Sequence, residues 1–401
     1  MTYIQHIRAQ FPAYTHSPDL VYLDSAATSQ KPAAVIESIS DYYQHANANV
    51  HRGIHTLTAQ STEQFEQARD VVQQFLGAKT RQEIIWTRGT TEAINLVANS
   101  FLLPRLRADD EILVPESEHH ANIVPWQLIA QKAHAKVIAI PVSEAGIIST
   151  EQLKSLINAK TRFIAVAHMT NVTGARQPIE QIIDIAHQHN IPVLVDGAQG
   201  VVHEEVNVEK LGADFYTFSG HKLFGPTGIG ALYARQAHLE EMTPWHGGGK
   251  MVQKVSFDGT TFSAAPAKFE AGTPNIAGAI GLASAITWFN QLPRDDIEQH
   301  LHALQRYTFE KLSELDDIVI LGYQEKSSII SFIVKDVHHQ DIATLLDEQG
   351  ISVRTGHHCA HPFMSRLGVD GTIRVSSALY NQKKDIDQLV SALKKALELL
   401  A

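Results

Sequence analysis

Three polar clusters in the chain each follow a short apolar run directly. The clusters are Asp196-Gly-Ala-Gln199 after Val193–Val195, Ser219-Gly-His221-Lys222 after Phe215–Phe218, and Thr87-Arg-Gly89-Thr-Thr91 after Ile84–Trp86. If these runs are neighbouring parallel strands, the clusters meet at the carboxyl edge of one sheet, where open α/β sheets bind ligands. The chain therefore has a candidate ligand site built from an acid, a lysine and a Gly-Thr-Thr turn.

Each cluster suits one part of a pyridoxal-phosphate (PLP) site. A helix that begins with Gly-Thr-Thr offers free N–H groups and hydroxyls to an anion such as phosphate. Asp196 can pair with a protonated pyridine nitrogen and keep the ring an electron sink, and Lys222 can form a Schiff base with the cofactor aldehyde. Taken singly, Asp196 is typical of a helix cap or a surface acid. The segment that contains Lys222 is, taken singly, typical of a loop. Together they predict PLP binding.

Cys359 is the only cysteine, and it lies in the segment Gly356-His-His-Cys-Ala-His361. One cysteine excludes an internal disulfide and a cysteine-rich zinc site. Metal ligands must converge, whereas adjacent side chains of an extended loop point apart, so we expect no metal here. A buried, inert thiol is a second alternative, but the polar Gly-His-His surroundings favour an exposed loop. A thiolate nucleophile beside histidines is the interpretation that remains.

Alternating helical and apolar segments must position these clusters. Residues 55–76 have helical spacing of apolar residues and end at Gly77. Strands are expected at 84–86, 111–114, 137–140, 163–167, 193–195 and 215–218, with helices at 91–99, 122–133, 151–157 and 179–188 between them. Nearly continuous Val/Ile/Leu runs separated by helices predict a mostly parallel sheet that helices cover on both faces.

The C-terminal part has a different pattern. Helices are expected at 277–290, 295–315, 340–348 and 383–400, and strands at 318–321, 329–334, 351–354 and 373–376. This pattern is typical of a smaller α+β domain. We predict a large PLP-binding α/β domain over 20–273, and a small domain made of 1–19 and 274–401 that carries the Cys359 loop and Arg374.

The composition excludes several classes of function. The 401 residues carry a formal net charge of −10 and no basic run, so a nucleic-acid partner is not expected. No apolar stretch approaches the roughly 18 residues of a membrane span. The first residues lack the apolar core and cleavage site of a signal peptide. A cytoplasmic enzyme is the expectation.

Several motifs together resemble the fold-type I, class V aminotransferase-like enzymes, and more narrowly the cysteine desulfurases. They are Tyr22-Leu-Asp-Ser-Ala-Ala-Thr28, Asn49-Val-His-Arg52, Arg88-Gly-Thr-Thr-Glu92, Glu118-His-His-Ala-Asn122, Asp196-Gly-Ala-Gln199, Ser219-Gly-His-Lys-Leu223, Gly247-Gly-Gly249, Glu270-Ala-Gly-Thr-Pro-Asn275 and Arg354-Thr-Gly-His-His-Cys-Ala360. The short loop around Cys359 is similar to group II desulfurases of the Suf and Csd type. The stretches from Trp245 and from Ser256 most resemble Csd-type desulfurases, also called cysteine sulfinate desulfinases.

The resemblance implies a large domain with a mostly parallel seven-stranded sheet between helices, a small α+β domain, and a role for each matching residue. Lys222 would carry PLP, Cys359 would be the nucleophile, and His119 would stack on the ring and transfer protons. The other implied cofactor contacts are Asp196 (pyridine nitrogen), Gln199 and Asn171 (ring hydroxyl), and Thr91, Ser219 and His221 (phosphate). Gly247 and Thr273 would reach the phosphate of a partner subunit, which implies a homodimer. The implied substrate contacts are Arg374, Asn171, His51 and Arg354.

The implied reaction removes sulfur from L-cysteine, releases L-alanine and leaves a persulfide on Cys359. A small acceptor of the SufE or CsdE type would then take the sulfur, for example toward iron–sulfur cluster assembly. Other reactions on the same fold remain open: selenocysteine lyase, cysteine sulfinate desulfination or a transaminase-like activity. A non-catalytic partner in sulfur trafficking that has kept the fold is the alternative from another class.

Overall fold

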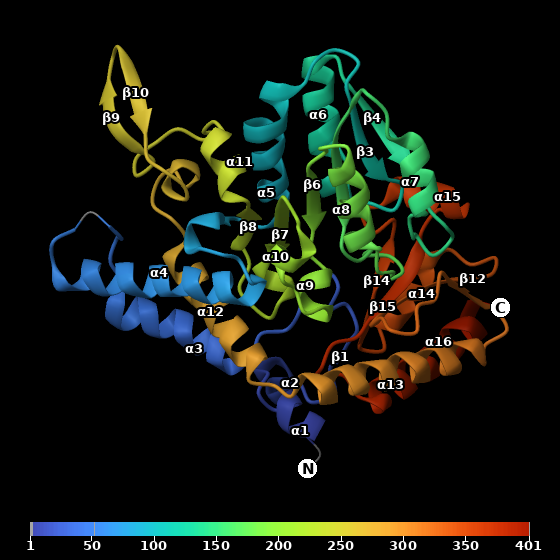
Figure 1. Cartoon of the computed structure of the whole chain (residues 1–401). Coiled ribbons are helices and arrows are strands. Elements are labelled where there is room, and N and C mark those ends of the chain that lie inside the picture. Colours follow the sequence, from blue (N-terminus) through green and yellow to red (C-terminus); the bar gives the residue numbers. More distant parts are fainter. Residues whose placement is uncertain (1–2, 52, 401) are drawn as a thin grey trace.

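A seven-stranded sheet lies at the centre of the computed structural model, which describes residues 3–51 and 53–400 (Figure 1). Its strand order is β2-β8-β7-β6-β5-β3-β4. The strands are β2 (Ile84–Thr87), β3 (Glu111–Pro115), β4 (Lys136–Ile140), β5 (Thr161–Ala167), β6 (Val193–Asp196), β7 (Phe215–Ser219) and β8 (Gly230–Ala234). Only β8 runs antiparallel to its neighbours β2 and β7. The predicted mostly parallel sheet is confirmed, although β8 itself was not predicted.

Helices cover both faces of this sheet with their apolar sides, so its inner strands are buried on both faces. One core cluster joins the sheet to α4 (Thr56–Leu76), α8 (Ile179–Gln188) and α12 (Ile276–Asn290). A second joins the opposite face to α5 (Thr90–Leu96), α6 (Val124–Ala133) and α11 (Gln236–Glu241). Shorter helices are α7 (Thr150–Leu156), α9 (Gly200–His203) and α10 (Val208–Leu211). The helix expected at 55–76 is α4, and Gly77 ends it with a left-handed φ of 64°.

The register of the strands brings the three polar clusters to one edge. Gly230 of β8 pairs with Ser219 of β7 on one side and with Thr87 of β2 on the other. Asp196, at the end of β6, pairs with Thr217 of β7. The carboxyl ends of β2, β7 and β6 therefore lie at one edge of the sheet, with the start of β8 between β2 and β7.

A second, antiparallel sheet of order β11-β12-β15-β14 forms the C-terminal part. Its strands are β11 (Ile318–Leu321), β12 (Ile329–Val334), β14 (Arg354–Gly356) and β15 (Thr372–Ser376), packed with α13 (Arg294–Ser313), α14 (His339–Asp347) and α16 (Lys383–Leu400). The short helix α15 (His361–Leu367) follows the Cys359 loop. This arrangement is the α+β pattern expected from the sequence.

Segments from the N-terminal part connect the two sheets. The strand β1 (Val21–Tyr22) pairs with β13 (Ile351–Ser352), and α1 (Tyr3–Arg8) and α2 (Pro12–His16) share a core cluster with Trp288 and Tyr380. The helix α12 packs on α3 (Ala33–Asp41) and α4. The domain limits at 20–273 and 274–401 stay a prediction, and Arg52 of the Asn49–Arg52 motif, like residues 1, 2 and 401 of the predicted small domain, lies outside the described residues.

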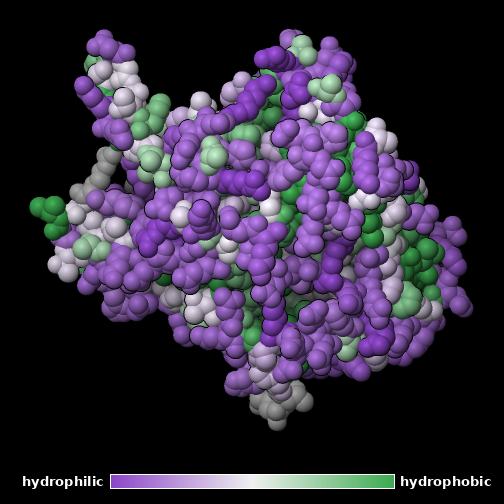
Figure 2. Space-filling view, in the orientation of Figure 1, coloured by the Kyte–Doolittle hydropathy of each residue, from purple (hydrophilic) through white to green (hydrophobic). Residues whose placement is uncertain are grey.

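An antiparallel hairpin of β9 (Val252–Ser256) and β10 (Gly259–Phe262) stands clear of the body in both overall views (Figures 1 and 2). Its side chains are almost all exposed, and Phe257 at its turn is fully exposed. The face drawn in Figure 2 is otherwise mostly hydrophilic, with a few apolar patches. In the described part of the chain no helix is both long and apolar enough to cross a membrane.

Candidate active site

A cavity of about 210 Å³ lies where the carboxyl edge of the large sheet meets the small one. Its lining contains most of the residues predicted for the site: Thr91, His119, Asn171, Asp196, Gln199, Ser219, His221, Lys222, Arg354 and Arg374. Strand ends supply the acid, the lysine and the hydroxyls, whereas β14 and β15 supply the two arginines. The two sheets together therefore make this cavity.

One end of the cavity is suited to an anion. The Ser219 hydroxyl accepts a hydrogen bond from the Thr90 N–H (2.9 Å) and donates one to the Thr90 hydroxyl (3.0 Å). Gly89, which precedes α5, has a φ of 146°, and a Cβ there would lie 3.0 Å from Ser219 Oγ. Glycine is needed at this turn for both reasons. The turn leaves N–H groups at the start of α5 and the Thr91 hydroxyl beside the cavity.

Asp196 and Lys222 lie across the cavity floor from two neighbouring strands. The Asp196 carboxylate is buried and accepts a hydrogen bond from the Ala198 N–H (2.9 Å). Burial raises the pKa of Asp196, and the charge of Lys222 partly opposes that rise. Burial also lowers the pKa of Lys222 to about 8, against the attraction of Asp196. A lysine with such a pKa carries free amine near neutral pH, as a nucleophile for carbonyls requires.

Two further side chains border the same space. The Gln199 side-chain amide donates to the Ala26 carbonyl (2.9 Å), which ties it to the N-terminal segment. His119 accepts a hydrogen bond at Nδ1 from the Ala121 N–H (3.0 Å). Burial, followed by the charge of Lys222, lowers the pKa of His119 to about 3. The ring is therefore neutral at physiological pH, and it can stack on a ligand ring without adding charge to the cavity.

Arg374 is a buried guanidinium that is only partly bonded. Its Nη1 donates to the Asn171 carbonyl (2.9 Å) and its Nη2 to Asp24 Oδ1 (3.0 Å), whereas Nε is buried without a partner. Burial lowers the pKa of Arg374 to about 10. A buried donor without a partner is costly, so an oxygen acceptor from a ligand fits here.

Cys359 lies beside the cavity rather than in its lining. Arg354 Nη2 is 3.7 Å from the Cys359 sulfur. His358 and Cys359 both have left-handed backbone, with φ of 51° and 57°. The His120 N–H donates to the Cys359 carbonyl and the Asn171 amide to the His358 carbonyl, each at 2.7 Å. Segments that follow β3 and β5 therefore hold the backbone of the half-buried Cys359 in a strained turn next to Arg354.

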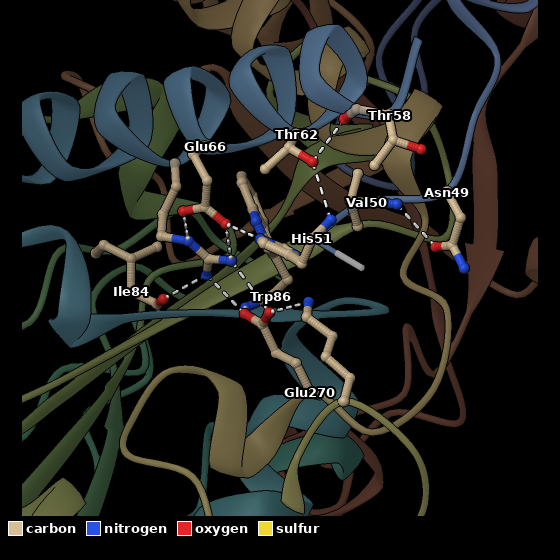
Figure 3. A network of polar contacts seen from close by, with 11 residues as sticks. Asn49, Val50, His51, Thr58, Thr62, Glu66, Ile84, Trp86 and Glu270 are labelled. Carbon is tan, nitrogen blue, oxygen red and sulfur yellow. Dashed lines mark hydrogen bonds and ion pairs between the residues drawn. The ribbon is translucent and has the colours of Figure 1, made fainter. Parts of the chain in front are cut away.

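The other predicted residues lie elsewhere in this chain. Thr273 lines a separate cleft of about 350 Å³ together with His246, the neighbour of Gly247. His51 contacts Glu66 (Nε2 to Oε1, 3.0 Å) and lies in the network of Figure 3. Gly247, Thr273 and His51 are thus not brought to the cavity of their own chain, and their roles stay predictions.

Three residues of the site were not predicted as such: Thr90, Asp24 and Glu118. Glu118 is fully buried and accepts hydrogen bonds from the Ala167 N–H (2.6 Å) and the Asn122 amide (2.8 Å). Burial raises its pKa to about 8. All three residues lie in motifs that carried the resemblance. Their position in the sequence next to a predicted site residue, or within the same motif, was therefore the only signal that could have indicated them. Their residue types alone indicated no role.

Three histidines stack next to Cys359. The ring centroids of His357 and His361 are 3.9 Å apart, and those of His361 and His120 are 4.8 Å apart. Within residues 3–51 and 53–400 no group of three or more His, Cys, Asp or Glu side chains is arranged to hold a metal ion.

The comparisons with known proteins identify the family. Residues 21–389 match the family model described as aminotransferase class-V, so the chain belongs to that family. Within it, the chain belongs with the cysteine desulfurases. It is 57% identical over its full length to a probable cysteine desulfurase of Vibrio cholerae, and 45% identical over its full length to a cysteine desulfurase of Escherichia coli, with each relative covered completely.

Solved structures agree with this assignment. The crystal structure of the cysteine desulfurase CsdA from Escherichia coli, in its S-sulfonic acid form, matches with a TM-score of 0.93 and 45% identity, over 100% of this chain and 99% of that one. The apo structure of a cysteine desulfurase from Thermococcus onnurineus matches with a TM-score of 0.94 and 36% identity, over 99% of both chains. The predicted fold class is confirmed.

Proposed function

We propose that this chain is a PLP-dependent cysteine desulfurase that takes sulfur from L-cysteine onto Cys359. The observation that carries the proposal is the shared cavity of Asp196, Lys222 and the Thr90–Ser219 anion end, with the Cys359 sulfur 3.7 Å from Arg354 at its border. Cysteine desulfurase relatives that span the whole chain support it.

The residues present fit PLP in each of its parts. The turn at Gly89, closed against Ser219, suits the phosphate, with Thr91 and His221 beside it. Asp196 suits the pyridine nitrogen, because a buried carboxylate with raised pKa gains from a cationic partner. Gln199 and Asn171 line the side for the ring hydroxyl, and the neutral His119 suits a position over the ring face.

With PLP bound, Lys222 and Arg374 would have different roles in the reaction. PLP, when bound through Lys222, draws electrons from the α-carbon of an attached amino acid. The Lys222 amine would remove the α-proton of the substrate and, after the sulfur has left, return a proton to the α-carbon of the product; its pKa of about 8 suits both roles. Arg374 holds the substrate carboxylate, for which its unpartnered Nε is free.

Sulfur transfer needs Cys359 as a thiolate. The thiolate forms an S–S bond with the substrate sulfur while the bond between that sulfur and the β-carbon breaks. The electron pair of that bond stays with the β-carbon, which takes a proton, and the product leaves as alanine. Cys359 is left as a persulfide, which a SufE- or CsdE-like acceptor with its own cysteine would collect.

Replacing Cys359 with Ser tests this chemistry. We expect alanine release from cysteine to fall by about 100-fold or more, because a serine hydroxyl is a poor nucleophile for sulfur. The visible absorbance of the bound cofactor should not change, since Lys222 is intact. Undiminished turnover of cysteine would contradict the persulfide step, and a colourless wild-type protein would contradict the PLP site itself.

One observation favours cysteine sulfinate as a second substrate. Two guanidinium groups, from Arg354 and Arg374, line the same cavity. A sulfinate and a carboxylate on one substrate give each arginine a partner. Sulfinate loss needs no attack by a thiol, so the Cys359→Ser variant should still desulfinate this substrate. Loss of both activities in this variant would contradict sulfinate loss without the thiol.

We also infer a homodimer. The exposed hairpin β9–β10 carries Val255 and Phe257, and Ile54 is exposed near α4, so apolar side chains face outward on this side. Gly247 and Thr273 lie away from the chain's own cavity, as expected for residues that serve a partner. Light scattering on the purified protein tests this directly: a monomeric mass contradicts it.

The cytoplasmic location expected from the sequence stays a prediction.

A further inference from the structure

The proposed function leaves Lys31 without a role, although its side chain contacts the turn that carries Lys222. Lys31 lies in Gln30-Lys-Pro32, just before α3, and does not line the cavity. Its Nζ donates to the Ser29 carbonyl (2.6 Å) and to the His221 carbonyl (2.7 Å). The second carbonyl belongs to the peptide unit that joins His221 to Lys222.

That carbonyl oxygen receives an unusual number of hydrogen bonds. Besides Lys31 Nζ, the Ser29 N–H, the Ser29 hydroxyl and the Thr28 hydroxyl all donate to it at 3.1 Å. A carbonyl oxygen has two lone pairs, so four donors exceed what satisfying it requires. The Ser29 hydroxyl also accepts from the Phe224 N–H at 2.9 Å, on the far side of Lys222. The backbone on both sides of Lys222 is therefore tied to one N-terminal segment.

The charge of Lys31 is also unpaired. Within the described residues no carboxylate lies within ion-pair distance of Nζ, and burial alone lowers the pKa of this half-buried amine to about 7. The titratable group that faces it is His221, whose own pKa the charge of Lys31 helps to lower. Keeping a cation here is costly for stability, and a neutral side chain would avoid that cost. The amine nevertheless lies beside the His221 carbonyl, to which it can donate at 2.7 Å in either protonation state.

We propose that Lys31 is a positioning residue for the Lys222 turn. Its amino group, with Thr28 and Ser29, holds the His221–Lys222 peptide unit so that the His221 ring stays at the anion end of the cavity and the Lys222 amine stays opposite Asp196. The proposal rests on the proposed PLP chemistry, in which a displaced amine transfers protons poorly. Small displacements of a catalytic group reduce rates steeply while leaving substrate contacts intact.

The test compares Lys31→Met with Lys31→Gln in the purified holoenzyme. Met keeps the length without a donor, and Gln restores neutral donors; the exposed Lys210→Met is the matched control. We expect Lys31→Met to lower kcat for cysteine about ten-fold with KM nearly unchanged, and to shift the pH titration of the visible cofactor absorbance. Lys31→Gln should recover part of both effects, and Lys210→Met should show neither.

An unchanged absorbance titration and unchanged kcat in Lys31→Met, with only a lower melting temperature, would overturn the proposal. If that variant does not fold, Thr28→Val removes one donor to the same carbonyl, and it must shift the titration in the same direction to a smaller extent; no shift would also overturn it. A wild-type protein that binds no PLP would overturn the proposed function together with this inference. A normal wild type with a silent Lys31→Met would overturn the inference alone.

Discussion

Two buried groups of charged side chains in this molecule show how a structural cluster differs from a functional one. The first joins Arg69 to Glu270 through two hydrogen bonds (2.6 and 3.0 Å), and Glu66 and Lys250 complete it (Figure 3). The second is the cavity group of Asp196, Lys222, Arg374 and their neighbours. Both lie in the interior, but the ion pairs of the first are more complete, whereas Arg374 in the second keeps a buried Nε without a partner.

The pKa values run in opposite directions in the two clusters. Pairing lowers the pKa of Glu270 and raises that of Arg69, so folding favours their charged forms. In the cavity, burial raises the pKa of Asp196 and lowers those of Lys222 and Arg374, so folding disfavours their charged forms. A cluster whose groups are only partly paired can take further partners from a ligand.

The largest effect is expected for Lys222→Ala. Activity toward cysteine should fall by about 10³-fold or more, since both the cofactor link and the proton-transfer group are lost. The visible absorbance that the cofactor shows when linked to Lys222 should disappear. The fold should be kept, because removing a poorly solvated amine relieves a desolvation cost. Absorbance spectra and melting curves measure both; an unchanged spectrum contradicts the assignment.

Arg69→Met should affect stability rather than chemistry. Removing one partner of a buried ion pair costs about 3–5 kcal/mol, here moderated by Lys250, which still contacts Glu270. The matched control is Arg81→Met, whose pair with Asp70 is partly exposed, so about 1 kcal/mol or less is expected. Urea unfolding of both variants makes the comparison. Equal losses of unfolding free energy in the two variants would mean that the buried network stabilises the fold no more than an exposed ion pair does.

Acidification should weaken the structural cluster. The folded pKa of Glu270 lies below its ordinary value of 4.5, so its stabilising contribution is full above that pH and is lost as the pH falls through the folded pKa. Asp214, which accepts from His187 and His238, behaves in the same way. Unfolding free energies between pH 7 and pH 3 should therefore decline, and Glu270→Gln should flatten that decline.

The smallest effect is expected for His51→Ala. His51 contacts Glu66 at the partly exposed border of the structural cluster, so stability should change by about 1 kcal/mol or less. If His51 contacts the substrate, as the resemblance implies, it does so in the cavity of a partner, and KM for cysteine then rises several-fold in the assembled enzyme. Unchanged KM and kcat would assign His51 to the structural cluster only.

Much of this architecture follows from local sequence patterns. The helix α4 and strands β2 to β7 lie where periodicity and apolar runs predicted them, because those signals report which face of an element is buried. The strand β8 was missed, since Gly-Ala-Leu-Tyr-Ala is short and rich in small residues. The hairpin β9–β10 was missed because its exposed residues carry no alternation toward a core.

The sequence by itself determined the strand-end acid, lysine and Gly-Thr-Thr turn, and it limited thiol chemistry to Cys359. The tertiary structure decided which distant residues meet there: Asp24 on Arg374, His120 on Cys359, and Lys31 behind Lys222. It also separated His51 from the cavity of its own chain. The physical reason is that burial patterns repeat every few residues along one element, whereas contacts between residues hundreds of positions apart depend on how the two sheets pack together.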